Sequence, residues 1–298
     1  WCVVCGVGCV VGIGIPSMAA NLARLTHAPN VVLIYESGTI GTKPSVLPLS
    51  IGDGELAETA DTVVSTPEIF THWLQSGRVE VGFLGAAQVD KFANLNSTVI
   101  GPYESPKVRL PGAGGAPEIA ALAKETLIII EHDKRKLVER VDFVTSAGYL
   151  RGGNERSEAG LSGGPSAVIT DLVVFEPDSV SKELVVTKIH AGVTKEQVCD
   201  STGWDVRFAN NLCQTASPTD ASDSQYKIMQ AVLTLCIVIL DGKKELVLHV
   251  GPHKTGSTTI QDAIKKLSAA PTMLTRTRRQ SSSIPNLAKG KATFKAWS

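Results

Sequence analysis

The sequence lacks an apolar run long enough to cross a bilayer. Its best candidate, "AVLTLCIVIL" at 231–240, has about half of the roughly 20 residues that a membrane helix needs. This run resembles the apolar core of a signal peptide, but it lies far from the amino terminus, where a signal peptide acts. Internal repeats are also missing. We predict a protein with no membrane partner and a cytoplasmic location, with an organelle as the alternative.

An excess of either charge is missing as well, because 29 Lys and Arg residues stand against 29 Asp and Glu residues. Bulk charge therefore indicates no nucleic-acid partner. The distribution is less even: residues 241–298 hold 11 basic and 3 acidic residues, which leaves residues 1–240 at a net charge of −8. A basic end of this kind is typical of a solvated, loosely ordered segment.

A second pair of metal ligands is missing beside the C-x-x-C of Cys2 and Cys5. Without one, this spacing indicates neither zinc nor redox chemistry. His249 and His253 are four residues apart, but Gly-Pro between them breaks any helix that would put them on one face. We predict no metal site, and buried free thiols in the cysteine-rich run at 2–9. The chain begins at Trp1 rather than Met, from which we expect a fragment or an incomplete gene model.

Short apolar segments alternate with helical patterns over residues 1–208, separated by Gly and Pro turns. This alternation predicts an α/β fold with an open, mostly parallel sheet and flanking helices. A Pro-Asp-Ser turn within 171–189 predicts an antiparallel addition. The expected strands are 9–13, 31–36, 79–85, 126–130, 141–146, 167–176 and 183–189, and the expected helices are 16–25, 66–77 and 116–124.

Beyond this domain the composition changes. Residues 209–225 are polar and rich in turn-forming types, which is typical of a linker. We predict a domain at 1–208, a linker at 209–228 and a small, poorly structured segment at 229–298 with a basic, disordered tail.

A strand followed by Gly12-Ile-Gly14 and a helix forms half of a dinucleotide-binding fingerprint. Glu36 lies at the end of the next strand, 22 residues after Gly14, where an acid that binds ribose would lie. Ser17 stands at the third glycine position, and Pro16 interrupts the turn, so NAD binding remains an alternative. In either case, backbone N–H groups at such a turn point towards a ligand.

Glu36 itself follows "VVLIY", at the carboxyl end of a predicted central strand. Ligands bind at this edge of open α/β sheets. Ser37-Gly38 permits a tight turn that presents the carboxylate. On the pattern alone, a solvated acid in a loop is the simpler interpretation.

Five segments together resemble class I CoA-transferases of the glutaconate CoA-transferase beta-subunit type. The resemblance covers roughly residues 10–208, in the order and spacing of the family. The segments are "GIGIPSMAANLARL", "YESG", "GAAQVDKFANLNST", "PGAGGAPEIA" and "EHDKRKLVERVDFVTSAGYL".

The resemblance implies that Glu36 is the catalytic nucleophile. It would attack an acyl-CoA thioester and form a glutamyl-CoA thioester, which a carboxylic acid resolves. The coenzyme A thioester is then a substrate, and no tightly bound cofactor is expected. Related steroid-ring hydrolases lack this glutamate, which favours transfer over hydrolysis. The implied substrate and CoA contacts are Gly12, Gly14, Ser37, Gly38, Gly112, Gly114, Gly115 and Ala116.

Two positions depart from the family pattern: Ala93 stands where glycine is common, and Ala147 where proline is common. Both substitutions affect the backbone conformation of a loop rather than a group that takes part in the reaction. The helix that precedes the first strand in the family is absent.

The family also implies a separate alpha subunit as partner, with the site formed between the two chains. "EHDKRK" at 131–136 would then contact that partner or the CoA phosphates, or form a solvated charged face.

A second phosphate-binding pattern follows in "VGPHKTGSTTIQ". It is not a Walker A loop, because Ser257 stands where that motif requires Lys. It resembles the phosphosulfate loop of sulfotransferases over about 20 residues, with Lys254, Gly256, Ser257 and Thr258 as the phosphate contacts. The chain holds too few residues beyond it to complete such a domain.

We therefore predict a CoA-transferase subunit that moves CoA from an acyl-CoA to a carboxylic acid through Glu36. The alternatives are a catalytically inactive or CoA-binding subunit and a sulfotransferase fragment. The identity of the acyl acid is not encoded in any of these motifs.

Overall fold

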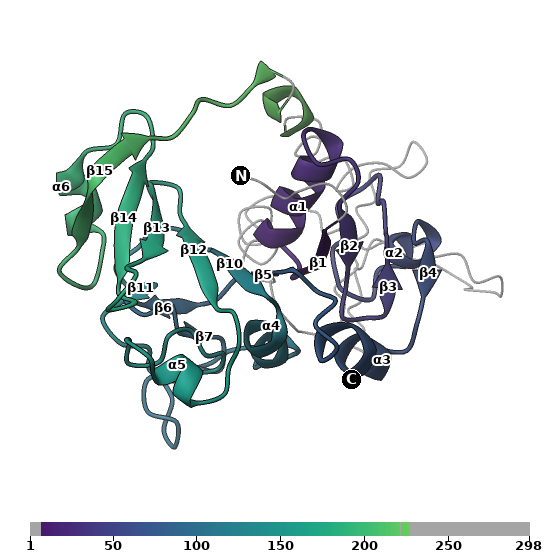
Figure 1. Cartoon of the computed structure of the whole chain (residues 1–298), viewed down its shortest axis with the longest axis horizontal. Coiled ribbons are helices and arrows are strands. Elements are labelled where there is room, and N and C mark those ends of the chain that lie inside the picture. Colours follow the sequence, from purple (N-terminus) through teal and green to yellow (C-terminus); the bar gives the residue numbers. More distant parts are fainter. Residues whose placement is uncertain (1–6, 221, 227–298) are drawn as a thin grey trace, which may run out of the picture.

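A sheet of ten strands runs from one side of the molecule to the other (Figure 1). The computed structural model describes residues 7–220 and 222–226. In spatial order the strands are β15 (Arg207–Gln214), β14 (Leu184–Ile189), β13 (Val173–Pro177), β12 (Pro165–Ile169), β10 (Glu125–Ile129), β5 (Val81–Leu84), β1 (Gly8–Val11), β2 (Val32–Ile34), β3 (Thr39–Ile40) and β4 (Thr62–Val63).

The central strands β2, β1, β5, β10 and β12 are parallel to one another. Val10 of β1 pairs with Ile34 of β2 on one side and with Gly82 of β5 on the other. The chain thus leaves β1 for β2 and returns to β5 on the opposite side. Such a reversal of strand order creates the crevice at the carboxyl edge where open α/β sheets bind ligands.

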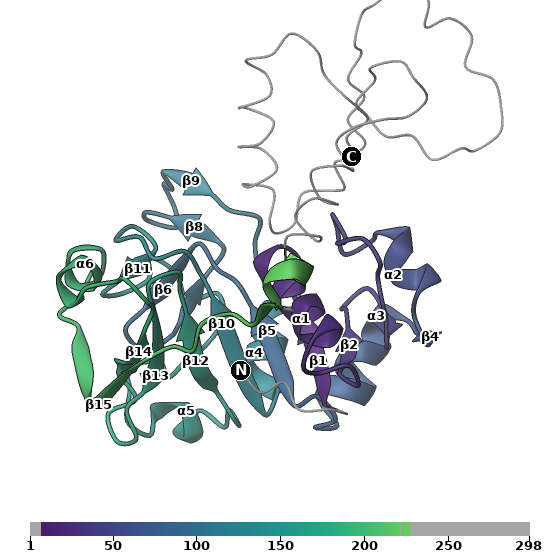
Figure 2. The ribbon, with the colours of Figure 1, turned by 90° about the horizontal axis from the view of Figure 1, so that it is seen from above.

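Two smaller sheets and short helices complete the described fold. In Figure 2 the ribbon of β8 and β9 projects from the main body. The small sheets comprise β11 (Leu137–Val138), β6 (Gln88–Asp90) and β7 (Leu95–Asn96), and β8 (Val99–Ile100) with β9 (Val108–Arg109). The helices are α1 (Ile15–Leu25), α2 (Gly54–Glu58), α3 (Thr66–Glu68), the π-helical η1 (Ile69–Leu74), α4 (Ala116–Leu122), α5 (Glu155–Glu158) and α6 (Lys195–Asp200).

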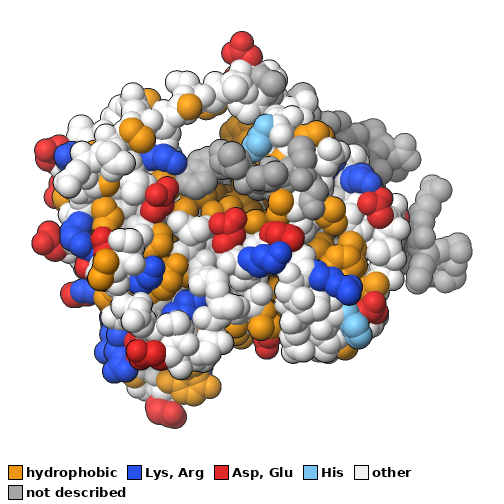
Figure 3. Space-filling view, in the orientation of Figure 1, with side chains coloured by type: hydrophobic (Ala, Val, Ile, Leu, Met, Phe, Trp, Pro, Cys, Tyr) orange, Lys and Arg blue, Asp and Glu red, His pale blue; other side chains and the backbone are white. Residues whose placement is uncertain are grey.

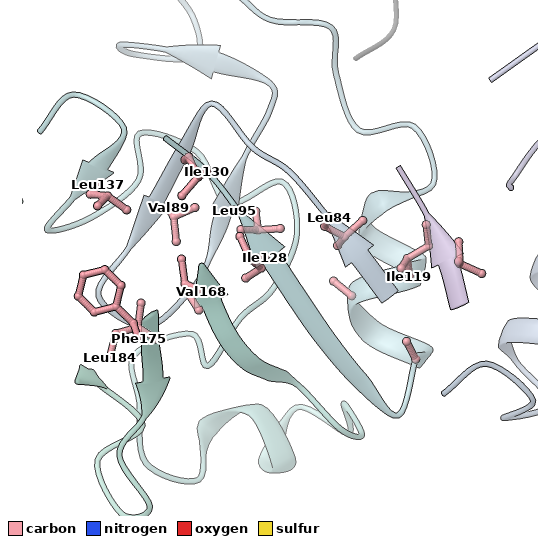
Figure 4. Packing of buried hydrophobic residues seen from close by; sticks show 14 of the residues in the cluster. Leu84, Val89, Leu95, Ile119, Ile128, Ile130, Leu137, Val168, Phe175 and Leu184 are labelled. Carbon is pink, nitrogen blue, oxygen red and sulfur yellow. The ribbon is translucent and has the colours of Figure 1, made fainter. Parts of the chain in front are cut away.

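Alternate side chains of the parallel strands belong to two hydrophobic clusters, one on each face of the sheet. Val11 and Leu33 pack with Ala20 of α1, whereas Val10 and Ile34 pack with Ile119 of α4. Figure 4 shows how the second cluster continues across the sheet to Phe175 and Leu184. Full burial of each such aliphatic side chain stabilises the fold by roughly 2 kcal/mol.

Most of the expected elements are present, and the expected mostly parallel α/β sheet is confirmed. The prediction of one strand at 167–176 was wrong, because the chain turns at Thr170–Leu172 and forms the antiparallel pair β12 and β13. The strand expected at 141–146 was also wrong. That segment joins strand pairing only through a bridge from Ser146 to Leu95, and Phe143 instead stacks on Tyr103.

The structure also bears on three further expectations: the domain boundary, the backbone at Ala93 and the membrane helices. Strand β15 crosses the proposed boundary at residue 208 and continues into the segment expected to be a linker, while the division into domains stays a prediction. Ala93 has a φ of 59°, so this position does require the backbone conformation that favours glycine. None of the helices within 7–220 and 222–226 is long and apolar enough to cross a membrane.

A buried guanidinium joins three segments behind α4. Arg156 is 3% exposed, and its N–H groups all donate to backbone carbonyls. The acceptors are Gly163 at 3.1 Å, Ala147 and Gly148 at 2.8 Å, Ser162 at 2.7 Å and Ala120 of α4 at 2.6 Å. The carboxyl end of α4 is therefore fixed to the loops at 147–148 and 162–163.

We expect Arg156→Ala to lower the free energy of unfolding by about 3–5 kcal/mol, because it leaves several buried carbonyls unpaired. The matched control is Arg151→Ala, which removes an exposed ion pair with Glu155 and should cost less than about 1 kcal/mol. Urea denaturation of both variants measures the difference. Equal midpoints for the two would show that the Arg156 network contributes nothing.

The expected buried thiol is confirmed at Cys9, which is free and fully buried in β1. Burial raises the pKa of this thiol to about 12, and the nearby Glu125 adds to the shift. Cys199 and Cys213 are free and exposed. At pH 8 a thiol of pKa about 12 is ionised to only about one part in 10⁴, so Cys9 is inert in the folded chain.

We expect iodoacetamide at pH 8 to alkylate Cys199 and Cys213 and to spare Cys9, because only the exposed thiolates are reactive. Peptide mass spectrometry after brief labelling measures this selectivity. Labelling in urea is the control, and there Cys9 should react as fast as the others. Equal labelling rates in the native protein would contradict the burial of Cys9.

Candidate functional site at the carboxyl edge of the sheet

Glu36 lies two residues beyond the end of β2 and belongs to the turn that β2 makes into β3. The turn closes through the Gly38 N–H, which donates to the Tyr35 carbonyl at 3.0 Å. Gly38 has a φ of 110°, and a Cβ there would lie 2.0 Å from the Val64 carbonyl oxygen. Only glycine fits this position, so Ser37-Gly38 is indeed the tight turn that the sequence predicted.

The direction of the Glu36 side chain follows from the pleat of β2. Side chains alternate between the faces of a strand, and Tyr35 belongs to the cluster around α1 while Ile34 belongs to the cluster around α4. Glu36 follows Ile34 at the next alternate position. Its carboxylate accordingly lies towards the amino end of α4, on the opposite face from α1.

The glycine-rich loop before α4 meets this carboxylate. The Gly115 N–H donates to Glu36 Oε2 at 2.8 Å, and Gly114 lies alongside, so a Cβ built there would be 3.6 Å from Glu36 Oε1. Within the loop Gly115 is buried, whereas Ala113 and Gly114 are exposed. The structure thus brings together two motifs that are 79 residues apart in the chain.

Phe70 of η1 closes one side of this contact. A Cβ on Gly115 would lie 2.2 Å from Glu36 Oε2 and 2.7 Å from Phe70 Cζ. Gly115 therefore occupies a slot between the carboxylate and the aromatic ring that no larger residue fits. Phe70 has no recognisable sequence signature, but π-helical turns such as η1 are frequent at functional sites.

The Gly12–Gly14 turn lies at the end of the neighbouring strand β1. Since Val10 pairs with Ile34, two further residues carry Gly12 and Glu36 to the same edge of the sheet. The Gly12 N–H donates to the Phe83 carbonyl at 3.0 Å, and Gly14 is the N-cap of α1 with a φ of 90°. The turn therefore lies at the same edge of the sheet as the carboxylate.

A buried hydroxyl pair fixes α1 to the end of β2. Ser17 Oγ and Tyr35 Oη are 2.7 Å apart, and Asn21 Nδ2 donates to the Ser17 carbonyl at 2.9 Å. Burial raises the pKa of Tyr35, which therefore stays a neutral hydrogen-bonding group. Ser17, the residue that breaks the dinucleotide fingerprint, thus has a structural partner directly before Glu36.

The other residues predicted as substrate contacts lie in the turn after β2 and around the glycine loop. The Ser37 hydroxyl is shielded from solvent and has no hydrogen-bond partner among the described residues. Ala116 opens α4, and its N–H donates to the Ala113 carbonyl at 3.2 Å. Gly112 lies at the entry of the glycine loop with a φ of 105°. The substrate roles assigned to these residues stay predictions.

The charged side chains of the "EHDKRK" segment form local ion pairs, and a role towards a partner or the CoA phosphates stays a prediction. Arg135 pairs with Asp133 at 3.0 Å and Lys136 pairs with Glu131. Arg135 holds the pKa of Asp133 down at about 2. On the face seen in Figure 3, acidic and basic side chains are intermixed in the same way.

His132 is a further titratable group at this edge, and it is buried. Its Nδ1 lies 3.0 Å from Thr170 Oγ1 and its Nε2 lies 2.9 Å from Thr202 Oγ1. Desolvation lowers its pKa, although Asp171 opposes the shift. With both ring nitrogens paired, His132 links the segment after β10 to the end of β12 and to the segment after α6. In the described part of the chain, no three His, Cys, Asp or Glu residues gather as a metal site.

Comparison with known proteins agrees with this geometry. The model of the coenzyme A transferase family matches residues 4–201, and the chain belongs to this family. It is 61% identical to the beta subunit of a 3-oxoadipate CoA-transferase of Pseudomonas knackmussii over 227 residues, which is 76% of this chain and 87% of the relative. It is 34% identical to the beta subunit of the glutaconate CoA-transferase of Acidaminococcus fermentans over 204 residues, or 66% and 76% of the two chains.

The fold agrees with a solved structure as well. The crystal structure of glutaconate CoA-transferase from Acidaminococcus fermentans superposes with a TM-score of 0.70 at 30% identity, over 75% of this chain and 87% of that one. The sulfotransferase-like pattern with Lys254, Gly256, Ser257 and Thr258 lies outside both the described residues and the family match. It stays a prediction.

We expect Gly115→Ala to destabilise the fold by about 2 kcal/mol, because the added methyl group overpacks the slot between Glu36 and Phe70. Gly52→Ala is the matched control, since a Cβ there would meet nothing closer than Ser50 Oγ at 3.8 Å. That change should stay within about 0.5 kcal/mol. Urea midpoints compare the two, and an unshifted midpoint for Gly115→Ala would mean that the slot has room for a methyl group.

Proposed function

We propose that this chain is the nucleophile-bearing subunit of a CoA-transferase and that Glu36 forms a covalent glutamyl-CoA thioester. The observation that supports this most directly is the Glu36 carboxylate held by the Gly115 N–H at the carboxyl edge of the sheet. A carboxylate that serves as nucleophile must be positioned against its target carbonyl. A glycine-rich loop that presents one fixed N–H is suited to that task.

The proposed reaction exchanges one thioester for another. A Glu36 oxygen attacks the acyl-CoA carbonyl, the C–S bond breaks, and CoA thiolate leaves behind an acyl-glutamyl anhydride. The thiolate then attacks the glutamyl carbonyl, which gives glutamyl-CoA and releases the first acid. The acceptor carboxylate then attacks glutamyl-CoA and releases the thiolate, which gives a second anhydride. The thiolate attacks the acceptor's carbonyl in this anhydride, which releases the new acyl-CoA and restores the Glu36 carboxylate. No net oxidation, reduction or proton transfer is required.

Backbone N–H groups supply the electrostatic part of the proposal. Each attack creates a tetrahedral oxyanion, and a preorganised donor at this position lowers the barrier by roughly 3 kcal/mol. Gly115, whose N–H already donates to Glu36 Oε2, is the first such donor for the oxyanion on the glutamyl carbonyl, and Gly112, Gly114 and Ala116 share its loop. We assign the remaining substrate and CoA contacts to Gly12 and Gly14 of the turn after β1, together with Ser37 and Gly38.

We propose 3-oxoadipate as the acceptor acid. The 3-oxoadipate CoA-transferase subunit is 61% identical to this chain, against 34% for the glutaconate enzyme. The motifs name no acyl acid, so this proposal of a 3-oxo dicarboxylic acid rests on the difference in identity alone. Both acids carry a second carboxylate, so the pocket needs a cationic or N–H contact for that group.

We also propose a separate alpha subunit, because both of these relatives are named as one subunit of a larger enzyme. In this chain alone Glu36 is only partly buried. A second subunit would complete the pocket and shield the anhydride from water. Copurification of the tagged chain with a coexpressed alpha subunit tests this assembly.

We expect Glu36→Gln to lower kcat by roughly 10³-fold or more, because the amide removes the nucleophile. The assay mixes the two-subunit complex with 3-oxoadipate and acetyl-, succinyl- or glutaryl-CoA and follows formation of 3-oxoadipyl-CoA. Sodium borohydride added with acyl-CoA should reduce the glutamyl thioester and mark residue 36 by mass spectrometry.

Glu118→Gln is the control, since it removes an exposed carboxylate in the first turn of α4. It should retain full activity and remain modified at Glu36. Full transfer by Glu36→Gln would refute the covalent mechanism. Acyl-CoA binding without transfer by the wild-type complex would instead favour the inactive or CoA-binding subunit, and release of free CoA without acceptor would favour a hydrolase.

A further inference from the structure

Ser97 makes two hydrogen bonds to the entry of the glycine loop. The Gly112 N–H donates to the Ser97 carbonyl at 2.9 Å, and the Ser97 hydroxyl donates to the Gly112 carbonyl at 2.9 Å. The carbonyl of Gly112 belongs to the peptide unit that leads into Ala113. The hydroxyl therefore fixes the orientation of the first peptide plane of the loop.

Ser97 is itself rigidly supported. Its N–H donates to Thr145 Oγ1 at 2.9 Å, and Thr145 Oγ1 lies 2.7 Å from Thr98 Oγ1. The Thr145 N–H donates to the Leu95 carbonyl at 2.8 Å, which ties this segment to β7. Ser97 is thus a fixed point on a hydrogen-bonded platform rather than a mobile surface serine.

The loop between Gly112 and Gly115 depends on such fixed points. Gly112 and Gly114 both have positive φ, at 105° and 54°, and glycine-rich segments gain little order from local sterics. The loop exits into α4, whose far end Arg156 anchors through the Ala120 carbonyl. Its entry is anchored at Ser97, and between the two anchors lies the N–H that binds Glu36.

We propose that Ser97 is a positioning residue, which holds the glycine loop so that the Gly115 N–H meets Glu36 and the oxyanion formed there. This inference rests on the proposed function of Glu36. Ser97 does not contact the carboxylate, so its effect passes through the orientation of the loop. A displacement of a reacting group by about 1 Å is sufficient to cost up to about 100-fold in rate.

The test compares Ser97→Ala, Ser97→Thr and the control Ser157→Ala in the two-subunit complex. Ser157 is an exposed serine whose hydroxyl also donates to a backbone carbonyl, that of Asn154 at 2.7 Å. We expect Ser97→Ala to lower kcat about tenfold with KM changed less than about twofold, because the loop loses orientation rather than substrate contacts. Borohydride trapping of residue 36 should slow by the same factor.

Ser97→Thr keeps the hydroxyl and should restore the wild-type kcat, and Ser157→Ala should change neither rate. A Ser97→Ala complex with full kcat would overturn the inference, as would an equal loss in Ser97→Thr. If Ser97→Ala does not assemble, Thr145→Val removes the support behind Ser97 and must slow trapping for the inference to hold. Transfer that persists in Glu36→Gln would instead refute the proposed function, so the two failures are distinguishable.

Discussion

The hydrogen bond from the Gly115 N–H to the Glu36 carboxylate is the contact on which the candidate site depends. A hydrogen bond to a charged group contributes about 1.5–3 kcal/mol, which is too little to order a glycine-rich loop on its own. The loop must therefore be placed by other means. Ser97 holds its entry, Arg156 holds the far end of α4, and Phe70 fills the space beside Gly115. The contact between Gly115 and Glu36 is the outcome of this framework rather than its cause.

The sheet imposes the second constraint. Tyr35 is buried against α1 and hydrogen-bonded to Ser17, so the next side chain along the chain is directed to the other face. A slip of one residue in β2 would direct Glu36 towards α1 and would bury its carboxylate in an apolar cluster. Because β1 and β2 end at the same level, the Gly12–Gly14 turn flanks the carboxylate as well. The fold thereby fixes on which face of the sheet the Glu36 carboxylate appears.

The sequence predicted the parts of this arrangement that repeat over several residues. Long apolar strands and the helices after Gly14 and Gly115 have a period that can be recognised, and Glu36 and the glycine loop were found through family motifs. Strands of two residues such as β3 and β7 have no period at all. Residues 141–146 alternate like a strand, yet Phe143 packs on Tyr103 of the projecting ribbon without a ladder. Ser97 and Phe70 act through one hydroxyl and one ring edge, and no pattern in a single sequence marks such contacts.

The partial exposure of Glu36 bears on how transfer is separated from hydrolysis. In the proposed mechanism, water competes with the CoA thiolate for the acyl-glutamyl anhydride and with the acceptor acid for the glutamyl-CoA thioester, so a transferase must exclude water while admitting a carboxylate. In this chain Phe70 and Gly115 cover one side of the carboxylate, but Ala113 and Gly114 leave the outer side of the loop exposed. A second subunit that covers the loop would exclude water and complete the acid pocket in the same step. If Glu36 is the nucleophile that we propose and Gly115 its oxyanion donor, the choice of transfer over hydrolysis then belongs to the interface.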